Sequence, residues 1–237
     1  MPRRGGNLEG GAQLPPRRRL EAIRAAIAEA GRELERAGLV QGTSGNLSVR
    51  DPASGAVAIT PSALPYRRIH PADVLVVGPG GAQEGPHRPS SELAMHLEVY
   101  RARADVGAVV HTHSPWATTW AVLGREIPAV HYVIAPLGNS VRVAPYATYG
   151  TAELAEGAVR ALGADNGVLL ASHGVLTVGT DLDAAVEHAM QVEFLAELYW
   201  KAVQVGEPTI LPPHELERVR AQTLAKRSAT PAAEAPP

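Results

Sequence analysis

The order of periodic segments constrains the fold more than any other feature of this sequence. Residues 15–38 begin with proline, place apolar side chains at helical spacing and end at a glycine, which predicts an amphipathic helix. Two strand-like runs follow at 46–50 and 56–60, joined by the turn sequence DPASG, and predict a β-hairpin. Helices at both ends and between strands, together with hairpins, predict an α/β layered domain on a mixed or antiparallel sheet.

The rest of the chain continues this alternation without a sequence repeat. Strands are predicted at 74–78, 106–113, 129–135, 141–147, 167–174 and 175–179. Helices are predicted at 90–103, 115–124, 151–163 and from Asp181, as N-cap, to about residue 205.

Composition narrows the class of protein. At 237 residues with 45% apolar content, we expect one compact domain over 15–227, between disordered tails at 1–14 and 228–237. The net charge of -2 offers no broad attraction to nucleic acid or to anionic membranes. The sequence has no cysteine, no apolar stretch near the ~20 residues of a spanning helix and no signal-peptide pattern. We therefore expect a cytoplasmic protein without disulfides or thiolate metal ligands.

Two histidines one residue apart end an apolar run, in AVVHTHSPW at 108–116. Because side chains alternate along a strand, His111 and His113 project from one face with Cα atoms about 6 to 7 Å apart, which suits chelation. His173 ends another apolar run and offers a third imidazole, and three protein ligands are typical of catalytic zinc. The alternative is that these histidines only end strands and contact solvent. The other histidines lie in predicted loops or helices, where a surface role is expected: His70, His87, His96, His131, His188 and His214.

Two further segments carry polar groups that could serve either as helix caps and turns or as ligands for a metal and a phosphate. Glu92 follows two serines at a predicted helix start, where a carboxylate favours the helix dipole but beside a metal can bind the ion and act as base. Ser90 and Ser91 can cap the helix or, with free backbone N–H groups, hold a phosphate. The loop QGTSGNLSVR at 41–50 has the glycines and neutral donors of a phosphate cradle, although composition alone favours an ordinary turn.

Seven segments in fixed order resemble the class II aldolase/adducin family and, within it, the L-fuculose-1-phosphate aldolases. They are QGTSGNLSVR, ITPSALPY, PSSE, AVVHTHSPWATTWAV, IPAVHYVIA, APYATYGTAELAE and SHG, and they cover roughly residues 39–200. The resemblance implies a three-layer α/β/α fold with a central, mostly antiparallel sheet. It also implies a C4 homotetramer with active sites at subunit interfaces.

The same resemblance implies the roles of particular residues. One divalent ion per subunit, normally Zn²⁺ although another divalent metal is possible, would be held by His111, His113 and His173. Glu92 matches the catalytic carboxylate, which also binds the metal in the resting state. Tyr132 matches a tyrosine that reaches a neighbouring subunit's site as proton donor. The phosphate-binding positions match Thr43, Gly45, Asn46, Ser62, Ser90 and Ser91.

The implied reaction cleaves L-fuculose 1-phosphate or a related 5-deoxyketose 1-phosphate to dihydroxyacetone phosphate and an aldehyde. The enediolate left by this cleavage needs a Lewis acid, and no lysine stands in these motifs for Schiff-base chemistry. A methylthioribulose-1-phosphate dehydratase or a sugar-acid phosphate decarboxylase would share the metal histidines, whereas a non-catalytic adducin-like interaction module would lack them. Two positions depart from the pattern: Ala63 replaces a glycine of the phosphate loop, and no tyrosine follows Trp200.

Overall fold

A nine-stranded mixed sheet forms the centre of the molecule, in the order β4-β3-β2-β1-β5-β9-β8-β7-β6. The structure is a computed structural model and describes residues 16–229. The strands are β1 (Asn46–Arg50), β2 (Val57–Ile59), β3 (Leu75–Val77), β4 (Gln83–Glu84), β5 (Ala108–Thr112), β6 (Ile127–Pro128), β7 (Ser140–Ala144), β8 (Gly167–Leu170) and β9 (Gly174–Gly179). β7 and β8 pair in parallel and the other pairs are antiparallel, which confirms the predicted sheet.

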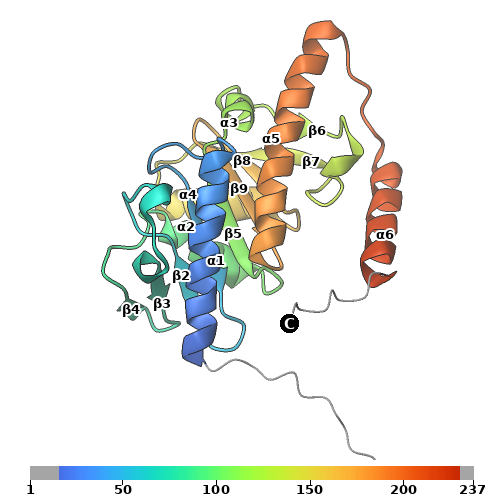
Figure 1. Cartoon of the computed structure of the whole chain (residues 1–237). Helices are drawn as coiled ribbons and strands as arrows, with labels where there is room; N and C mark the ends of the chain where they lie inside the picture. The colour runs from blue at the N-terminus through green and yellow to red at the C-terminus, as the bar shows by residue number, and fades with distance from the viewer. Residues whose placement is uncertain (1–15, 230–237) are drawn as a thin grey trace, which may run out of the picture.

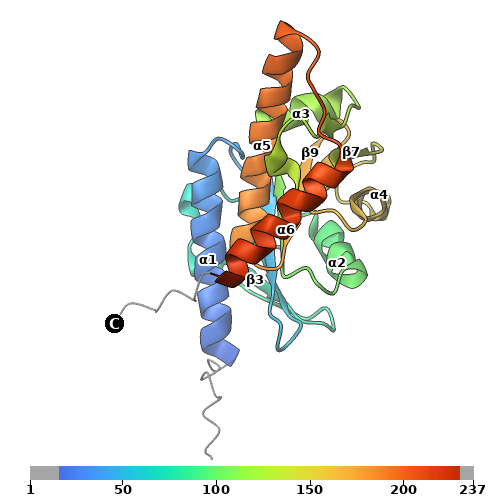
Figure 2. The same ribbon diagram turned by 90° about the vertical axis from the view of Figure 1, so that its right-hand side faces the viewer.

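Helices cover both faces of this sheet. They are α1 (Pro16–Arg36), α2 (Leu93–Ala102), α3 (Pro115–Val122), α4 (Ala152–Leu162), α5 (Leu182–Val205) and α6 (Pro213–Ala229), with short 3₁₀ helices η1 (Tyr66–Arg68), η2 (Pro71–Asp73) and η3 (Tyr132–Ile134). Figure 1 shows α1 and α5 in front of the sheet, and Figure 2 shows α2 and α4 on the opposite side. The predicted three-layer α/β/α architecture is confirmed.

The alternation of side chains along β5 feeds both helical layers. Ala108 and Val110 pack into the apolar cluster under α1 and α5, whereas Val109 packs into the cluster under α2 and α4. Since His111 lies two residues after Val109, its side chain leaves the strand on the face that α2 covers. The period of the strand therefore decides which helix the histidine meets.

The predicted strand at 129–135 is wrong. Only the two residues of β6 precede it, and residues 132–134 form the 3₁₀ helix η3, capped by His131 Nδ1, which accepts from the Val133 amide. Ile134 and Ala135 are both buried although they are adjacent, which a strand with alternating faces would not allow. The run is apolar, short and flanked by Pro128 and Pro136, and a short apolar run in a sequence does not distinguish a strand from a helical turn.

Other element boundaries also differ from the prediction. α2 begins at Leu93 rather than at residue 90, and 171–173 form a turn between β8 and β9 instead of continuing a strand. Helix α6 was not predicted, because it buries little apart from Leu216 and is otherwise largely polar. It lies along the β6–β7 side of the molecule (Figure 1), where Arg220 donates to the carbonyl of Ala135.

The predicted tails, 1–14 and 228–237, lie outside the described residues except at 228 and 229, where α6 continues. Among the helices of the described chain, none has both the length and the apolar character needed to cross a bilayer.

Candidate active site

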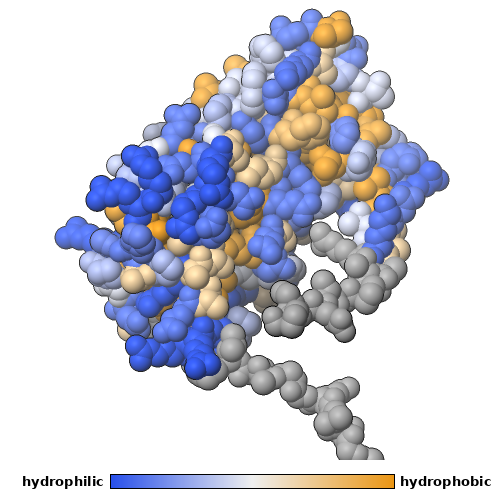
Figure 3. All heavy atoms as spheres, in the orientation of Figure 1, coloured by the Kyte–Doolittle hydropathy of each residue, from blue (hydrophilic) through white to orange (hydrophobic). Residues whose placement is uncertain are grey.

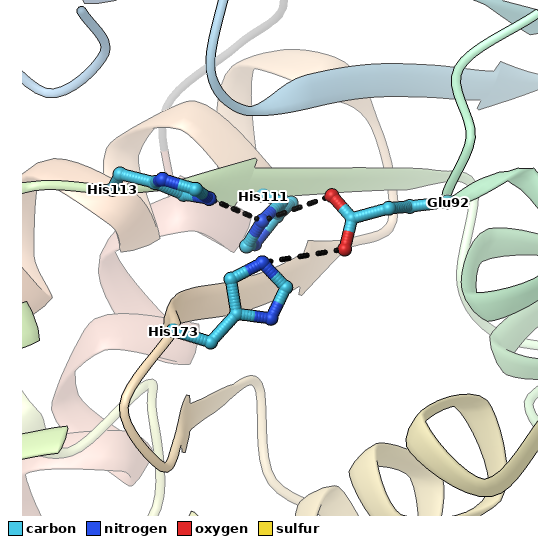
Figure 4. A group of neighbouring side chains, drawn as sticks. All are labelled: Glu92, His111, His113 and His173. Carbon is cyan, nitrogen blue, oxygen red and sulfur yellow. Dashed lines mark hydrogen bonds and ion pairs between the residues drawn. The ribbon is translucent and has the colours of Figure 1, made fainter. Parts of the chain in front are cut away.

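Four side chains from three separate parts of the chain converge at one end of β5. His111 is the last residue of β5 that pairs with β1, and His113 directly follows the strand. Glu92 immediately precedes α2, and His173 lies in the β8–β9 turn. Their ligand atoms all lie within 4.8 Å of one another, and Figure 4 shows them pointing toward a common centre. We call these four residues the histidine–carboxylate cluster.

The backbone around the cluster brings His173 to the other histidines. β5 and β9 pair through Thr112 and Val175, so the turn before β9 passes directly beside the end of β5. Ser172 adopts a left-handed conformation with φ 52°, which is unfavourable for a residue with a β-carbon and is typical of functional turns. The three imidazole centroids lie 4.8 to 5.0 Å apart.

The hydrogen-bond partner of His111 shows that the cluster suits a cation. His111 Nδ1 lies 2.8 Å from the carbonyl oxygen of Val175, which can only accept, so in the neutral ring Nδ1 carries the proton. Nε2 then presents its lone pair to Glu92 Oε2 at 3.2 Å, which places two acceptors face to face. A cation between Nε2 and the carboxylate would remove this repulsion. The hydrogen bond from Nδ1 to Val175 would then hold the imidazole in the orientation that binds the cation.

The distances within the cluster fit a tetrahedral ion. His111 Nε2 lies 3.0 Å from His113 Nε2, and His173 Nε2 lies 3.4 Å from Glu92 Oε1. Ligands at 2.0 to 2.1 Å from zinc at tetrahedral angles would be roughly 3.3 Å apart. Within the described residues, this cluster is the one group of three or more such ligands that could hold a metal ion.

Protonation also favours metal binding. Burial, reinforced by the neighbouring histidines, lowers the pKa of both His113 and His173 to about 4. Burial alone would raise the pKa of Glu92, but His111, Asn46 and His173 outweigh it and hold that pKa well below its usual range. Near neutral pH the cluster therefore offers uncharged His113 and His173 imidazoles and an ionised carboxylate, the forms that bind a divalent metal.

A cavity of about 260 Å³ opens beside the cluster and contains every position predicted to bind phosphate. Its lining includes Thr43, Gly45, Asn46, Ser62, Ser90 and Ser91, together with Glu92, His113 and His173. None of the described residues that line it is a lysine or arginine. Hydroxyls, backbone N–H groups and the start of α2 are thus the groups that an anion would meet here.

The loop that is predicted to bind phosphate contains Ala63, where the resemblance implies a glycine. Ala63 adopts φ 58°, a conformation that glycine reaches without strain and alanine reaches at a cost of about 1 kcal/mol or more. The loop keeps its place through the Ser62 amide, which donates to the carbonyl of Arg88 at 2.9 Å, and through the bridge between Pro61 and Pro89. The loop is therefore held in place although Ala63 has a strained backbone.

Several residues of the site were missed or misplaced in the sequence prediction. Asn46, expected to bind phosphate, also donates from Nδ2 to Glu92 Oε2 at 2.9 Å. His96 was expected on the surface but is fully buried and bonded to Asn46, and His188 is also buried. The four-residue spacing between Glu92 and His96 could have indicated that they share a helix face. Tyr149 lies within the segment APYATYGTAELAE but was assigned no role, and it lines the cavity.

Tyr132 is not brought to this cavity. It lies on η3, its side chain is 57% exposed, and its ring packs at 4.5 Å from that of His131. Its predicted part as a proton donor to a neighbouring subunit stays a prediction.

Fold and site together define an α/β/α protein with a cluster able to hold a metal ion and, beside it, a cavity lined by hydroxyl and amide groups. Residues 25–200 match the sequence family described as Class II Aldolase and Adducin N-terminal domain. The chain belongs to this family.

Particular relatives agree with this assignment. The chain is 46% identical over 199 residues to the 5-methylthioribulose-1-phosphate/5-deoxyribulose-1-phosphate aldolase of Rhodospirillum rubrum, covering 84% of this chain and 89% of that protein. It is 43% identical over 201 residues to the 5-deoxy-D-ribulose 1-phosphate aldolase of Bacillus thuringiensis, covering 84% and 94%. A solved structure of an L-fuculose 1-phosphate aldolase has a TM-score of 0.83 at 40% identity, covering 86% of this chain and 96% of that one. The predicted family, fold and enzyme class, a carbon–carbon lyase of the class II aldolase type, are confirmed.

Proposed function

We propose that this protein is a zinc-dependent aldolase that cleaves a 5-deoxyketose 1-phosphate to dihydroxyacetone phosphate and an aldehyde. The observation that carries the proposal is the juxtaposition of the histidine–carboxylate cluster with a cavity lined by neutral donors. Such a cavity can hold the phosphate of the substrate while the reacting carbons lie beside the cluster.

The residues of the site divide the chemical work. His111, His113 and His173 would hold the metal, which supplies Lewis-acid stabilisation of the negative charge that develops on the substrate oxygens. Glu92 would hold the metal in the resting state and, in the direction of synthesis, take a proton from the donor carbon of dihydroxyacetone phosphate. Thr43, Gly45, Asn46, Ser62, Ser90 and Ser91 would bind the phosphate and so fix the reacting carbons in place.

The substrate class follows from the relatives. The Rhodospirillum rubrum and Bacillus thuringiensis proteins are named for 5-deoxyribulose 1-phosphate or its methylthio analogue, at higher identity than the fuculose-phosphate aldolase of Escherichia coli at 40%. We therefore place 5-deoxyribulose 1-phosphate and 5-methylthioribulose 1-phosphate ahead of L-fuculose 1-phosphate.

The active form is proposed to be a cytoplasmic homotetramer in which Tyr132 serves a neighbouring site. Apolar side chains stand exposed on α5, among them Phe194, Trp200 and Val203, and Figure 3 shows apolar surface gathered over the upper part of this helix. The ring of His131 connects Tyr132 to Phe194, with centroid distances of 4.5 and 5.6 Å. Contact with a second copy would cover this apolar surface and immobilise the tyrosine.

A substrate panel tests the proposal. Metal-loaded protein is given the three ketose 1-phosphates, and released dihydroxyacetone phosphate is coupled to NADH oxidation. We expect release from the two 5-deoxy substrates and a fall in kcat of about 10²- to 10⁴-fold in Glu92→Gln. Loss of water or of carbon dioxide from methylthioribulose 1-phosphate or a sugar-acid phosphate, without dihydroxyacetone phosphate, would establish the dehydratase or the decarboxylase instead.

Metal dependence is tested with paired histidine variants. His113→Ala should lose both bound metal and activity, whereas His214→Ala, an exposed histidine on α6, should keep both. Elemental analysis of the purified protein identifies the metal, and full activity after exhaustive chelation would refute the metal mechanism.

A further inference from the structure

A continuous chain of buried hydrogen bonds runs between β1 and α2 and ends on Glu92. The Tyr100 hydroxyl lies 2.8 Å from Ser48 Oγ, which lies 2.7 Å from His96 Nδ1. His96 Nε2 lies 2.5 Å from Asn46 Oδ1, and Asn46 Nδ2 lies 2.9 Å from Glu92 Oε2. All five side chains are buried, with exposures of 0% for Ser48 and His96 and 6% for Glu92.

Strand and helix periods bring these groups together. Asn46 and Ser48 occupy alternate positions of β1 and face α2, while Leu47 between them packs toward α1. Glu92, His96 and Tyr100 are spaced by four residues and therefore lie on one face of α2, with Glu92 at its N-cap and the other two within the helix. Asn46 is also the direct ladder partner of His111, so the polar face of β1 adjoins the histidine–carboxylate cluster.

The carboxylate fixes the direction of every bond in the chain. An ionised Glu92 only accepts, so the Asn46 amide must turn its NH₂ toward it and its oxygen toward His96. His96 Nε2 must then carry the proton, which leaves Nδ1 to accept from the Ser48 hydroxyl. Ser48 in turn accepts from Tyr100. A flipped Asn46 would place its oxygen 2.9 Å from Glu92 Oε2, with two acceptors in contact.

We propose that His96 is a positioning residue for Glu92: its Nε2–H holds the Asn46 oxygen and thereby keeps the amide NH₂ aimed at the carboxylate. The inference rests on the proposed part of Glu92 as proton acceptor and deepens it. Without the bond from His96, the Asn46 amide is free to turn, and Glu92 loses the donor that holds Oε2 beside His111. His96 does not line the cavity, so it acts through Asn46 alone.

Two substitutions of His96 separate positioning from packing. The side-chain amide of glutamine reaches about as far as Nε2 of histidine, so His96→Gln keeps a donor to Asn46. The amide of asparagine reaches only as far as Nδ1, so His96→Asn keeps the contact to Ser48 and loses the one to Asn46. His188→Asn is a matched control at another buried histidine, which lies on α5. An asparagine there keeps the contact that His188 Nδ1 makes to the carbonyl of Val178.

The readout is proton transfer itself. Exchange of a carbon-bound proton of dihydroxyacetone phosphate with D₂O, followed by proton NMR, requires no aldehyde and so reports on Glu92 even where the tested ketoses are the wrong substrates. We expect His96→Asn to slow exchange and lower kcat roughly 10- to 100-fold, as loss of a partner that orients a ligand does. His96→Gln and His188→Asn should stay close to wild type. Equal exchange in all these proteins would overturn the inference.

A measurement on the unmodified protein covers the case in which a variant fails to fold. ¹⁵N NMR of histidine-labelled wild type should show His96 as the Nε2–H tautomer, and an Nδ1–H tautomer would overturn the inference whatever the activity. Wild type that exchanges the proton but cleaves none of the panel refutes only the proposed substrate class. Wild type that neither exchanges nor cleaves refutes the proposed function and, with it, the part given to His96.

Discussion

Gly174 is the position at which one added methyl group would meet three parts of the site at once. A β-carbon there would lie 2.4 Å from the Thr112 carbonyl oxygen, 3.0 Å from His113 Cδ2 and 3.2 Å from His111 Cε1. Ordinary contact begins near 3.4 Å, so the backbone between the two histidines would have to move by about 1 Å. Metal–ligand distances tolerate only about 0.2 Å, so the ligands would no longer reach the ion together.

Gly174→Ala is therefore expected to lose about 1 to 3 kcal/mol of unfolding free energy and to weaken metal binding roughly 10- to 100-fold. Urea unfolding of the metal-free protein measures the first effect, and competition with a chromogenic chelator measures the second. Gly157→Ala is the matched control: it lies within α4, where the nearest atom to an added β-carbon is the Arg160 terminus at 3.9 Å. That variant should gain up to about 1 kcal/mol. Wild-type stability and metal affinity in Gly174→Ala would refute the reasoning.

Three further substitutions or conditions test other parts of the structure. The Glu193 carboxylate accepts hydrogen bonds from the backbone amides of Trp116 and Ala117, at 2.9 Å each. Glu193→Ala should therefore lower the unfolding free energy by about 1 to 3 kcal/mol, and each kcal/mol should lower Tm by ~2 to 4 °C. An unchanged Tm would contradict this prediction. Burial lowers the pKa of His96 to about 3, so between pH 6.5 and 3 the unfolded chain binds a proton that the folded one does not. As the pH is lowered through this range, the unfolding free energy should therefore decrease by about 1.4 kcal/mol per pH unit more in wild type than in His96→Gln. Equal slopes in the two proteins would refute this prediction. Ala63→Gly should relieve the backbone strain at residue 63, where φ is 58°, although glycine also gives the unfolded chain more entropy. The unfolding free energy measured in urea should therefore rise by between 0 and about 1 kcal/mol. A clear decrease would show that the methyl group of Ala63 makes stabilising contacts.

The sequence was sufficient where a side chain's position depends on a local period. His111 and His113 share a face because strands alternate, and the three histidines with Glu92 form one cluster as the motifs indicated. The long helix from Asp181 has the predicted N-cap, whose carboxylate accepts from the Ala184 amide at 2.8 Å. The shared face of His111 and His113 and the N-cap at Asp181 depend on neighbours close in sequence, whereas the approach of Glu92 and His173 was indicated only by the resemblance.

Long-range contacts decided the elements that were missed. The run at 129–135 is as apolar as a strand, but the prolines on either side of it and its packing against α5 favour η3 instead. Helix α6 depends on a few contacts, such as the buried Leu216, that no local pattern reveals. His96 is predicted at the surface because it lies on a predicted helix, whereas polar partners on a distant strand, Asn46 and Ser48, make its burial favourable.

The position of β5 also affects how long different parts of the site stay ordered. β5 is the central strand, paired along its length with β1 and β9, so its amides exchange with solvent only when the whole sheet opens. The loop that carries Ser62 and Ala63 is held by far fewer backbone bonds, and it can open while the sheet stays closed. Hydrogen exchange should therefore distinguish two parts of the site: amides of β5, beside the histidine–carboxylate cluster, should stay protected for the lifetime of the native state, whereas amides of the loop at Ser62 and Ala63 should exchange many times within it.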